Sequence, residues 1–561
     1  MARTPLLTAL QRSLRMARWS LQTGREPAEA WQREDERAAA RRVAGPRDVG
    51  PRDISRRNFL AAGGAAAVTL SLRGVARAAA PARGRGRVIV IGAGIAGLTC
   101  AYRLREAGIG VRVFEAQNRV GGRMSSLRGH FDDGQVAELG GELIDSGHAH
   151  LHGLARELGL PIDDLAPNGS DERAVWFFGG AKRTEEEVVE AFLPVAVRIT
   201  AARARLGPDD VTYRSAGAAR ELDRLSIAEW LDRIGVSGWF RQLLDVAFTT
   251  EFGQEIDRQS ALNFLTTIDP VAQPFRLYGE SDERFHVRGG NDLVPKTLAG
   301  RLDGAIEMNC ALERIRRRPD GLLECSFRRG SGTFTAAADH VVVAVPFSLL
   351  RDVTIDADLT PAKRRAIAEL GYGTNAKLMI GFKARRWRTQ YASGGSTLTD
   401  LPYQLTWETS RLQDGSSGIL TNFTGGRHGV ELGEGAATDR AGEVAGQLDL
   451  VYPGLAVLRT KEARFHWPSF PYTRGSYACY LPGQWTSMRG VEQEPAGNLH
   501  FAGEHCSLAA QGFMEGGCET GERAAAEVMA ALGLPAQGRA RLRAPAAHGA
   551  TDMSGRSHIR R

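Results

Sequence analysis

The stretch from Val88 to Glu115 restricts the possible fold more than any other part of the chain. It opens with Val88-Ile89-Val90-Ile91, a continuous apolar run typical of a strand buried on both faces. Gly92-Ala93-Gly94-Ile95-Ala96-Gly97 follows at once, and its glycines permit a tight turn, approach of a pyrophosphate to the backbone and close packing of the next helix. Glu115 ends a second apolar strand, where a carboxylate can bind ribose hydroxyls. The sequence therefore predicts a dinucleotide-binding strand–helix–strand unit.

A second glycine-containing segment distinguishes between dinucleotides. The chain continues Ala116-Gln117-Asn118-Arg119-Val120-Gly121-Gly122-Arg123, which resembles the extended FAD fingerprint of flavoproteins. In that fingerprint Gly121, Gly122 and Arg123 form a loop that closes on the pyrophosphate, and an NAD domain has no use for it. The cofactor expected from this segment is FAD.

Two motifs near the C-terminal end fit the same cofactor. Asn498-Leu499-His500-Phe501-Ala502-Gly503-Glu504 indicates a short strand entering a turn, where Glu504 is placed to hold the ribityl hydroxyls. Gly512-Phe513-Met514-Glu515-Gly516-Gly517 begins the last predicted helix, which extends to Leu532. A helix N-terminus stabilises negative charge, here on the pyrimidine ring of a reduced flavin.

Together these blocks resemble the flavin-dependent amine oxidase family, which includes monoamine, polyamine and L-amino-acid oxidases, over about residues 86–533. The resemblance implies an α/β fold with a Rossmann-type FAD-binding domain of the two-dinucleotide-binding-motif type and an interleaved α+β substrate domain. It places the FAD domain at 86–155, 284–346 and 490–533, and the substrate domain at 156–283 and 347–489. It also implies that Leu312 touches adenine through its backbone and that Gly140, Gly141 and Glu142 pass close to the flavin.

Lys377 is the first residue that the resemblance places at the reacting centre. It lies in the apolar segment Ala376-Lys377-Leu378-Met379-Ile380, predicted as a strand. In the family, a lysine at this place holds a water against flavin N5 and assists the reaction of the reduced flavin with oxygen. The alternative interpretation is a solvated lysine on an outward face, and Lys383 and Lys296 are weaker candidates for the same role.

Three aromatic residues and one serine complete the predicted centre. Ser476 matches the cysteine that binds FAD covalently in monoamine oxidases, so the resemblance implies non-covalent FAD here. Tyr477 and Phe513 match the two walls of an aromatic cage, and Trp467 matches a tryptophan near the flavin. The alternative for all three rings is a role in the core.

Glu142 and Asp145 are the predicted substrate residues. Polyamine oxidases place a carboxylate at the position matching Asp145 to hold a distal ammonium, whereas L-amino-acid oxidases have an arginine nearby. The block Glu138–Asp145 holds carboxylates and no arginine, which favours a cationic amine over the alternative of solvated loop carboxylates. An amino-acid substrate remains an alternative if Arg474 faces the cavity.

The reaction implied is transfer of a hydride from the amine α-carbon to the flavin, hydrolysis of the imine, and reduction of oxygen to hydrogen peroxide. An L-amino-acid oxidase, an amine dehydrogenase with a periplasmic electron acceptor and a non-catalytic flavin-binding protein remain alternatives. The six cysteines are scattered without ligand spacing, so no metal site is expected.

The net charge of +7 belongs to the two ends of the chain. Residues 1–87 carry +11 and residues 536–561 carry +5, so residues 88–535 carry −9. A basic folded surface for nucleic acid is therefore not expected. The longest apolar run, Leu60–Leu72, is too short to span a bilayer, so we expect no stable membrane insertion.

The N-terminal segment predicts export. Residues 1–54 are predicted to be a disordered basic leader, and residues 55–80 resemble a twin-arginine signal: Ser55-Arg56-Arg57-Asn58-Phe59-Leu60, an apolar run, and Ala76-Arg77-Ala78 as cleavage site. This predicts passage through the twin-arginine translocase, a mature chain beginning near Ala79, and a periplasmic or secreted location. Residues 534–561 are predicted to be a flexible basic tail, and the oligomeric state is left open.

Overall fold

The structure is a computed structural model that describes residues 86–166, 174–267 and 281–534. The predicted leader, the twin-arginine segment and the basic tail beyond Leu534 lie outside these ranges. The statements below concern the described residues.

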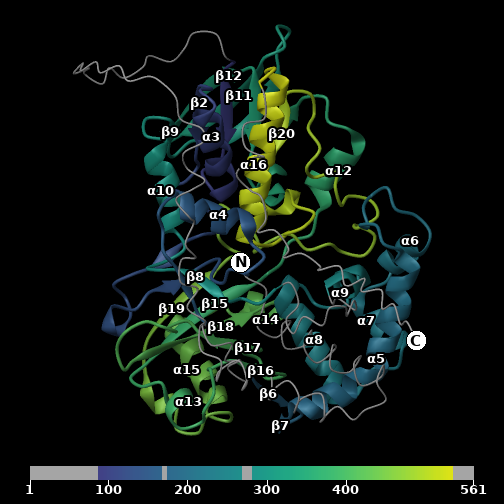
Figure 1. The fold of residues 1–561 in the computed structure, drawn as a ribbon, viewed down its shortest axis with the longest axis vertical. Coiled ribbons are helices and arrows are strands. Elements are labelled where there is room, and N and C mark those ends of the chain that lie inside the picture. The colour runs from purple at the N-terminus through teal and green to yellow at the C-terminus, as the bar shows by residue number, and fades with distance from the viewer. Residues whose placement is uncertain (1–85, 167–173, 268–280, 535–561) are drawn as a thin grey trace, which may run out of the picture.

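A five-stranded parallel sheet lies in the upper half of the molecule as drawn in Figure 1. Its strand order is β20-β13-β1-β2-β9, and each neighbouring pair is parallel. The bounds are β1 Val88–Ile91, β2 Val111–Phe114, β9 Ile306–Glu307, β13 His340–Val343 and β20 Leu499–Phe501. Every residue of β1 is buried, as its continuous apolar run predicts. Strands from the beginning, middle and end of the chain thus present their carboxyl ends at one edge.

Two helices pack closely against each other beside this sheet (Figure 1). They are α3 Ile95–Glu106 and α16 Met514–Ala531. A Cβ atom added at Gly517 would lie 2.6 Å from Ile95 Cγ2, and one at Gly521 would lie 2.4 Å from the Ala96 carbonyl oxygen. The glycines therefore set the helix spacing. Helix α16 begins at Met514, within the motif Gly512–Gly517 that the sequence predicts as the start of the last helix.

A mixed seven-stranded sheet forms the second layer, in the order β19-β15-β18-β17-β16-β6-β7. Its neighbouring strands are antiparallel except for β6 and β16. All seven residues of β15 are buried, including Lys377. The bounds are β6 Val175–Phe178, β7 Ala181–Arg183, β15 Ala376–Phe382, β16 Thr397–Thr399, β17 Leu405–Glu408, β18 Gly418–Thr424 and β19 Arg459–His466.

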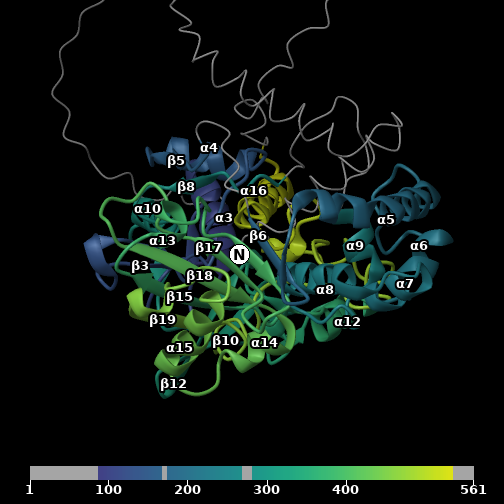
Figure 2. The same ribbon diagram turned by 90° about the horizontal axis from the view of Figure 1, so that it is seen from below.

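A group of helices lies beside the mixed sheet, as Figures 1 and 2 both show. The apolar spacing within residues 185–260 predicts helices there, and two of them begin with capping boxes at Thr184 and Ser226. The bounds are α5 Glu185–Leu206, α6 Ala218–Asp223, α7 Ile227–Arg233, α8 Gly238–Phe252 and α9 Ala261–Thr267.

Smaller elements complete the described fold. A four-stranded sheet has the order β12-β11-β10-β14, and two-stranded sheets pair β3 with β4 and β5 with β8. The strand bounds are β3 Ser126–Leu127, β4 Ala137–Glu138, β5 Ile162–Asp164, β8 Phe285–Val287, β10 Ala311–Arg317, β11 Leu323–Arg329, β12 Gly332–Ala338 and β14 Thr354–Asp356. The helix bounds are α4 Ala149–Glu157, α10 Leu293–Arg301, α11 Phe347–Leu350, α12 Pro361–Glu369, α13 Arg386–Thr389, α14 Gly426–Glu431, α15 Ala437–Leu448, η2 Asp132–Gly134, η3 Ala456–Leu458 and η4 Glu504–Cys506.

All six cysteines are buried free thiols. Among the residues that the structure describes, no group of His, Cys, Asp and Glu side chains is arranged to hold a metal ion. Within the same residues, no helix combines the length and the apolar character that crossing a bilayer requires.

Candidate active site

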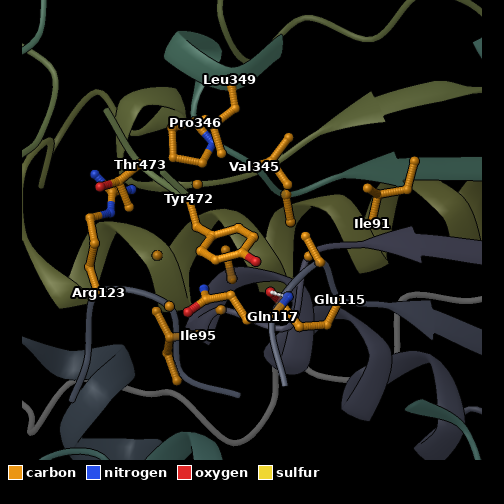
Figure 3. Close-up of a pocket in the computed structure, with 18 of the residues that line it drawn as sticks. Ile91, Ile95, Glu115, Gln117, Arg123, Val345, Pro346, Leu349, Tyr472 and Thr473 are labelled. Carbon is orange, nitrogen blue, oxygen red and sulfur yellow. Dashed lines mark hydrogen bonds between the residues drawn. The ribbon is translucent and has the colours of Figure 1, made fainter. Parts of the chain in front are cut away.

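A cavity of about 450 Å³ opens at the carboxyl ends of β1, β2 and β13 (Figure 3). Ligands of parallel sheets bind at this edge. Thirteen of the residues that we predict to bind the cofactor line it: Gly92, Gly94, Ala96, Glu115, Ala116, Gly122, Arg123, Leu312, Gly503, Glu504, Gly512, Phe513 and Met514. The other four, Gly97, Gly140, Gly141 and Glu142, do not line it.

The first glycine loop, residues 92–97, leaves the backbone at Gly94 open to a phosphate. Gly94 is the N-cap of α3, and a Cβ atom there would meet nothing within 4 Å. The second loop packs on the first, because the Gly121 N–H donates to the Ala93 carbonyl at 2.9 Å. Gly121 and Gly122 have φ angles of +102° and +56°, which favour glycine. A helix N-terminus between two glycine loops fits a dinucleotide pyrophosphate.

Gly97 has a packing role in this arrangement. A Cβ atom at Gly97 would lie 2.0 Å from the Gly92 carbonyl oxygen, so only glycine lets α3 approach β1 this closely. Glu115 is held at the same edge, where its carboxylate accepts from the N–H groups of Ala93 at 2.7 Å and Gln117 at 2.8 Å. Burial raises the pKa of Glu115 against the lowering effect of these donors. Its geometry fits a partner with hydroxyl donors, such as a ribose.

Arg123 and Glu504 connect the second glycine loop to the C-terminal motif. Arg123 Nη1 lies 2.7 Å from Glu504 Oε1 and 2.9 Å from the Ser476 carbonyl oxygen. The second oxygen of Glu504 accepts from the Gly512 N–H at 2.8 Å. Burial alone would raise the pKa of Glu504, but Arg123 and the hydrogen bonds outweigh it and lower the pKa. The ion pair therefore fixes three distant segments around one edge of the cavity.

Lys377 is buried in an ion pair. Its Nζ donates to Glu142 Oε2 at 2.7 Å, to the Gly140 carbonyl at 2.9 Å and to the Glu138 carbonyl at 3.2 Å. The Lys377 side chain is 2% exposed, so the alternative of a solvated lysine is wrong. Burial would raise the pKa of Glu142, but Lys377 and the hydrogen bonds from Trp407 and Thr409 outweigh burial, so the pKa is lowered.

The segment 139–141 is fixed from two sides. Trp467 Nε1 donates to the Leu139 carbonyl at 3.0 Å, and the Gly141 N–H donates to the Arg123 carbonyl at 3.1 Å. A Cβ atom at Gly140 would lie 1.8 Å from the same carbonyl oxygen. This segment therefore supports the Arg123 loop instead of lining the cavity, and Trp467 and Lys377 both hold it in place.

The aromatic pair and Ser476 occupy defined positions. Phe513 lines the cavity and packs against His148 with ring centroids 5.0 Å apart. The Tyr477 hydroxyl donates to the Glu251 carbonyl at 2.5 Å. Ser476 is fully buried and its hydroxyl donates to Asn375 Oδ1 at 2.7 Å.

Both predicted substrate carboxylates have partners inside the protein. Asp145 Oδ1 accepts from the Glu283 N–H at 2.7 Å, and Asp145 Oδ2 lies 3.2 Å from His148 Nε2. The second oxygen of Glu142 accepts from Trp407 Nε1 at 2.9 Å and from the Thr409 hydroxyl at 2.7 Å. Asp145 and Glu142 are thus buried, unlike the solvated loop carboxylates of the alternative interpretation.

Arg474 is the residue on which the alternative of an amino-acid substrate depends. It forms an ion pair with Asp352, and both residues line the cavity. Other lining residues were missed by the sequence argument. Val345 and Pro346 are the second and third residues after the end of β13, so the shared edge of a parallel sheet was a signal for them. Tyr472, which Figure 3 shows turned into the cavity, carried no such signal.

The sequence matches a family model described as flavin containing amine oxidoreductase over residues 95–529. A putative L-amino-acid oxidase of Bacillus subtilis, YobN, is 27% identical over 79% of this chain and 94% of its own length. A putative flavin-containing monoamine oxidase of Mycobacterium tuberculosis, AofH, is 28% identical over 79% of this chain and 97% of its own.

Solved structures share the fold. Wild-type putrescine oxidase bound to putrescine superposes with a TM-score of 0.68 at 22% identity, covering 79% of this chain and 99% of that one. Cyclohexylamine oxidase from Brevibacterium oxydans superposes with a TM-score of 0.69 at 21% identity, covering 80% of this chain and 100% of that one.

Proposed function

The chain belongs to the family of flavin-containing amine oxidoreductases, and we propose that it is an oxidase that binds FAD without a covalent bond and oxidises amines. The observation that carries the proposal is the cavity at the carboxyl ends of the parallel strands, with its two glycine loops, buried Glu115 and aromatic Phe513. The two glycine loops and the Glu115 carboxylate suit a dinucleotide. The ring of Phe513 suits an apolar reacting centre beside that dinucleotide.

Each end of the cavity has a separate role in binding. The N-terminus of α3 and the Gly121–Gly122 loop would hold the pyrophosphate, and Glu115 would accept from the ribose. The N-terminus of α16 would stabilise negative charge on the ring system. When bound, FAD supplies the hydride acceptor that no protein side chain can provide.

Lys377 and three aromatic residues would control the reacting centre. Lys377 is held by the segment 138–142, so it contributes a fixed positive charge without contact to bulk water. In our proposal this charge favours the reaction of oxygen, in which negative charge develops. Tyr477 and Phe513 would exclude water and orient the amine, and Trp467 would fix the backbone behind them.

Ser476 supports non-covalent binding of the cofactor. A serine hydroxyl at the position where monoamine oxidases carry the attached cysteine offers no thiolate for a thioether bond. In addition, its hydroxyl is engaged with Asn375 and is fully buried.

An L-amino-acid oxidase is the second candidate, because YobN carries that name. Its substrate would need a cation for the carboxylate. Arg474 is paired with Asp352, whereas the carboxylate of Asp145 contacts His148, whose ring packs against Phe513. These charges favour a cationic amine.

The proposal is tested by anaerobic titration of the purified holoenzyme with monoamines, diamines and L-amino acids while the flavin absorbance is followed. Bleaching by amines, with one peroxide formed per turnover once oxygen is admitted, supports it. Bleaching by amino acids alone would identify the second candidate. Reduction of an artificial acceptor without oxygen uptake would indicate a dehydrogenase, and no bleaching would indicate a non-catalytic flavoprotein.

We also propose that the chain is exported by the twin-arginine translocase and acts in the periplasm or outside the cell. The paired arginines Arg56 and Arg57, the apolar run after them and the Ala76-Arg77-Ala78 site support this proposal. That translocase carries folded proteins, which suits an enzyme that takes up its cofactor before export.

A further inference from the structure

Asn375 carries a fully buried amide just before β15, two residues from Lys377. Its Nδ2 donates to the Thr250 carbonyl oxygen at 2.8 Å, and its Oδ1 accepts from the Ser476 hydroxyl at 2.7 Å. A carbonyl oxygen only accepts, so the contact with Thr250 fixes which end of the amide is the nitrogen. The side chain therefore joins the end of α8 to the segment that carries Tyr477.

The contact at α8 satisfies a group that the helix leaves without a partner of its own. The last four carbonyl groups of an α-helix accept no hydrogen bond within it, and α8 ends at Phe252. The Thr250 carbonyl accepts from Asn375. The Tyr477 hydroxyl donates to the Glu251 carbonyl at 2.5 Å and lies 3.4 Å from the Thr250 carbonyl. Asn375 and Tyr477 thus bind adjacent carbonyls of one helix end, so a shift of that end moves the acceptor of the Tyr477 hydroxyl.

Two glycines enclose this amide closely. A Cβ atom added at Gly253, directly after α8, would lie 2.2 Å from Asn375 Oδ1. One added at Gly373 would lie 2.4 Å from Ser476 Oγ and 2.9 Å from Asn375 Oδ1. Packing this close leaves the amide little room to move. Its two hydrogen bonds therefore fix one arrangement of α8 and Ser476.

Ser476 and Tyr477 connect this arrangement to the cavity. Arg123, which lines the cavity, donates to the Ser476 carbonyl oxygen at 2.9 Å, while the Ser476 hydroxyl is bound to Asn375. A Cβ atom added at Gly512, another lining residue, would lie 3.4 Å from Tyr477 Cδ2. The Tyr477 ring therefore packs against the lining of the cavity, and its position depends on contacts outside the cavity.

Asn375 and Lys377 are close in the chain, yet they hold different parts of the site. Lys377 Nζ binds the segment 138–142. Asn375 binds the end of α8 and Ser476, on which the position of Tyr477 depends. In the proposed function the lysine serves the reaction of oxygen, whereas the tyrosine orients the amine. The two half-reactions therefore depend on separate contacts, and each can be disturbed without the other.

We propose that Asn375 is a positioning residue, which fixes the Tyr477 ring and through it the orientation of the amine during reduction of the flavin. This inference rests on the proposed amine oxidase function. Asn375 does not line the cavity, and it acts through the end of α8 and through Ser476. Hydride transfer requires a precise approach of the reacting carbon, so a small displacement of the ring that orients the amine slows this step.

The first test compares Asn375→Asp with Asn422→Asp as a matched control. Asn375→Asp keeps the size of the side chain and the oxygen that Ser476 binds, but it sets a second oxygen against the Thr250 carbonyl in place of a donor. Asn422 is an equally buried asparagine on β18, whose amide also donates to backbone carbonyls, those of residues 403 and 405. The control loses the same kind of contact elsewhere in the mixed sheet.

Stopped-flow measurement on the holoenzyme separates the two half-reactions. Asn375→Asp should slow reduction by a substrate amine by about 10- to 100-fold and leave the reaction of the reduced enzyme with oxygen nearly unchanged. The control should change neither rate. Equal slowing of both half-reactions in a variant that still binds FAD would assign Asn375 a structural role and overturn the inference, as would an unchanged rate of reduction. Both results would leave the proposed amine oxidase function intact.

The second test needs no turnover, so it decides the inference even if no amine is oxidised. Thermal unfolding of the holoenzyme is measured for the wild type, Asn375→Asp, Tyr477→Phe and the double variant. Each single substitution should lower the unfolding temperature, and the double variant should lose less than the sum, because both side chains bind the same helix end. Asn422→Asp combined with Tyr477→Phe should give the full sum. Additive losses for Asn375 and Tyr477 would show that the two residues act separately and would overturn the inference.

Discussion

The Nζ atom of Lys377 lies 2.7 Å from Oε2 of Glu142, and the two side chains are 2% and 4% exposed. Lys377 lies on β15 of the mixed sheet, whereas Glu142 follows the glycines that support the Arg123 loop. The ion pair therefore connects the mixed sheet to the dinucleotide-binding part of the molecule. Because both charges are away from water, each depends on the other for its stability.

The first prediction concerns the stability of this pair. Lys377→Met leaves the Glu142 carboxylate buried without its cation, so we expect a loss of about 3–5 kcal/mol in the free energy of unfolding. In the double variant Lys377→Met, Glu142→Gln the unpaired charge is removed, and most of that loss should disappear. Denaturant unfolding of the wild type and the three variants measures the coupling. Additive effects of the two substitutions would show that the side chains do not interact.

The second prediction concerns the role of Lys377 in the reaction of the reduced enzyme with oxygen. Lys377→Met should slow the reaction of the reduced enzyme with oxygen by about 100-fold, because negative charge develops there. Reduction by substrate should change much less, since loss of hydride from a neutral amine needs no cation. Stopped-flow measurement of the two half-reactions separates the effects. If both slow equally, the lysine has no specific role toward oxygen.

The third prediction concerns the pH dependence of stability at Glu283. Burial, Asp145, Glu251 and Glu142 raise the pKa of this carboxyl in the folded protein, and Arg411 lowers it. Folding therefore loses free energy as the pH rises through the normal carboxyl range to the raised pKa.

Glu283→Gln has no proton to lose, so it should match the wild type in acid and be more stable by about 1–3 kcal/mol above the raised pKa. Thermal unfolding of the substrate-free enzyme over a series of pH values, from the normal carboxyl range upward, measures the difference. A variant less stable than the wild type at every pH value would contradict the prediction.

The fourth prediction concerns attachment of the cofactor. The hydroxyl of Ser476 is buried and hydrogen-bonded to Asn375, so we expect no covalent bond to the flavin there. Precipitation of the protein by acid should therefore release all yellow colour into the supernatant. The measurement is the absorbance of supernatant and pellet. Colour kept in the pellet would show a covalent bond elsewhere, and the buried thiol of Cys479 would be the first residue to replace.

The fifth prediction concerns export. Arg56→Lys combined with Arg57→Lys should leave the protein folded, yellow and confined to the cytoplasm, because the translocase recognises the arginine pair. Fractionation of cells with detection of the flavoprotein measures the location. Normal export of this variant would refute the twin-arginine assignment.

The sequence predicted best the parts of the structure that depend on local backbone requirements. The apolar run Val88–Ile91 is required by a buried strand, the glycines around Gly94 by a tight turn, and the carboxylate of Glu115 by a ligand. These residues meet at one edge of the sheet. Lys377 could be placed on a strand, but not in an ion pair with Glu142. That contact depends on how β15 packs against a segment more than two hundred residues earlier, and no local pattern encodes it.

Glu283 is a second residue whose surroundings could not be predicted from the sequence. Its neighbours in the chain, Asp282 and Arg284, are also charged, and nothing in the letters distinguishes it from a solvated loop residue. What sets it apart is its burial, its left-handed backbone and the carboxylates that the fold gathers around it. These are tertiary properties, so only the folded structure reveals the residue.

The parallel sheet also determines when this protein can finish folding. Strand β1 is made first, yet its neighbour β13 is about 250 residues away, and β13 in turn waits for β20 at Leu499–Phe501. A chain growing on the ribosome therefore carries an incomplete sheet, with apolar strands unpaired, until synthesis is almost over. Loop closure over such separations is slow, so the nascent chain needs protection from aggregation. Losing the last strand and α16 would take one neighbour from β13 and the packing partner from α3.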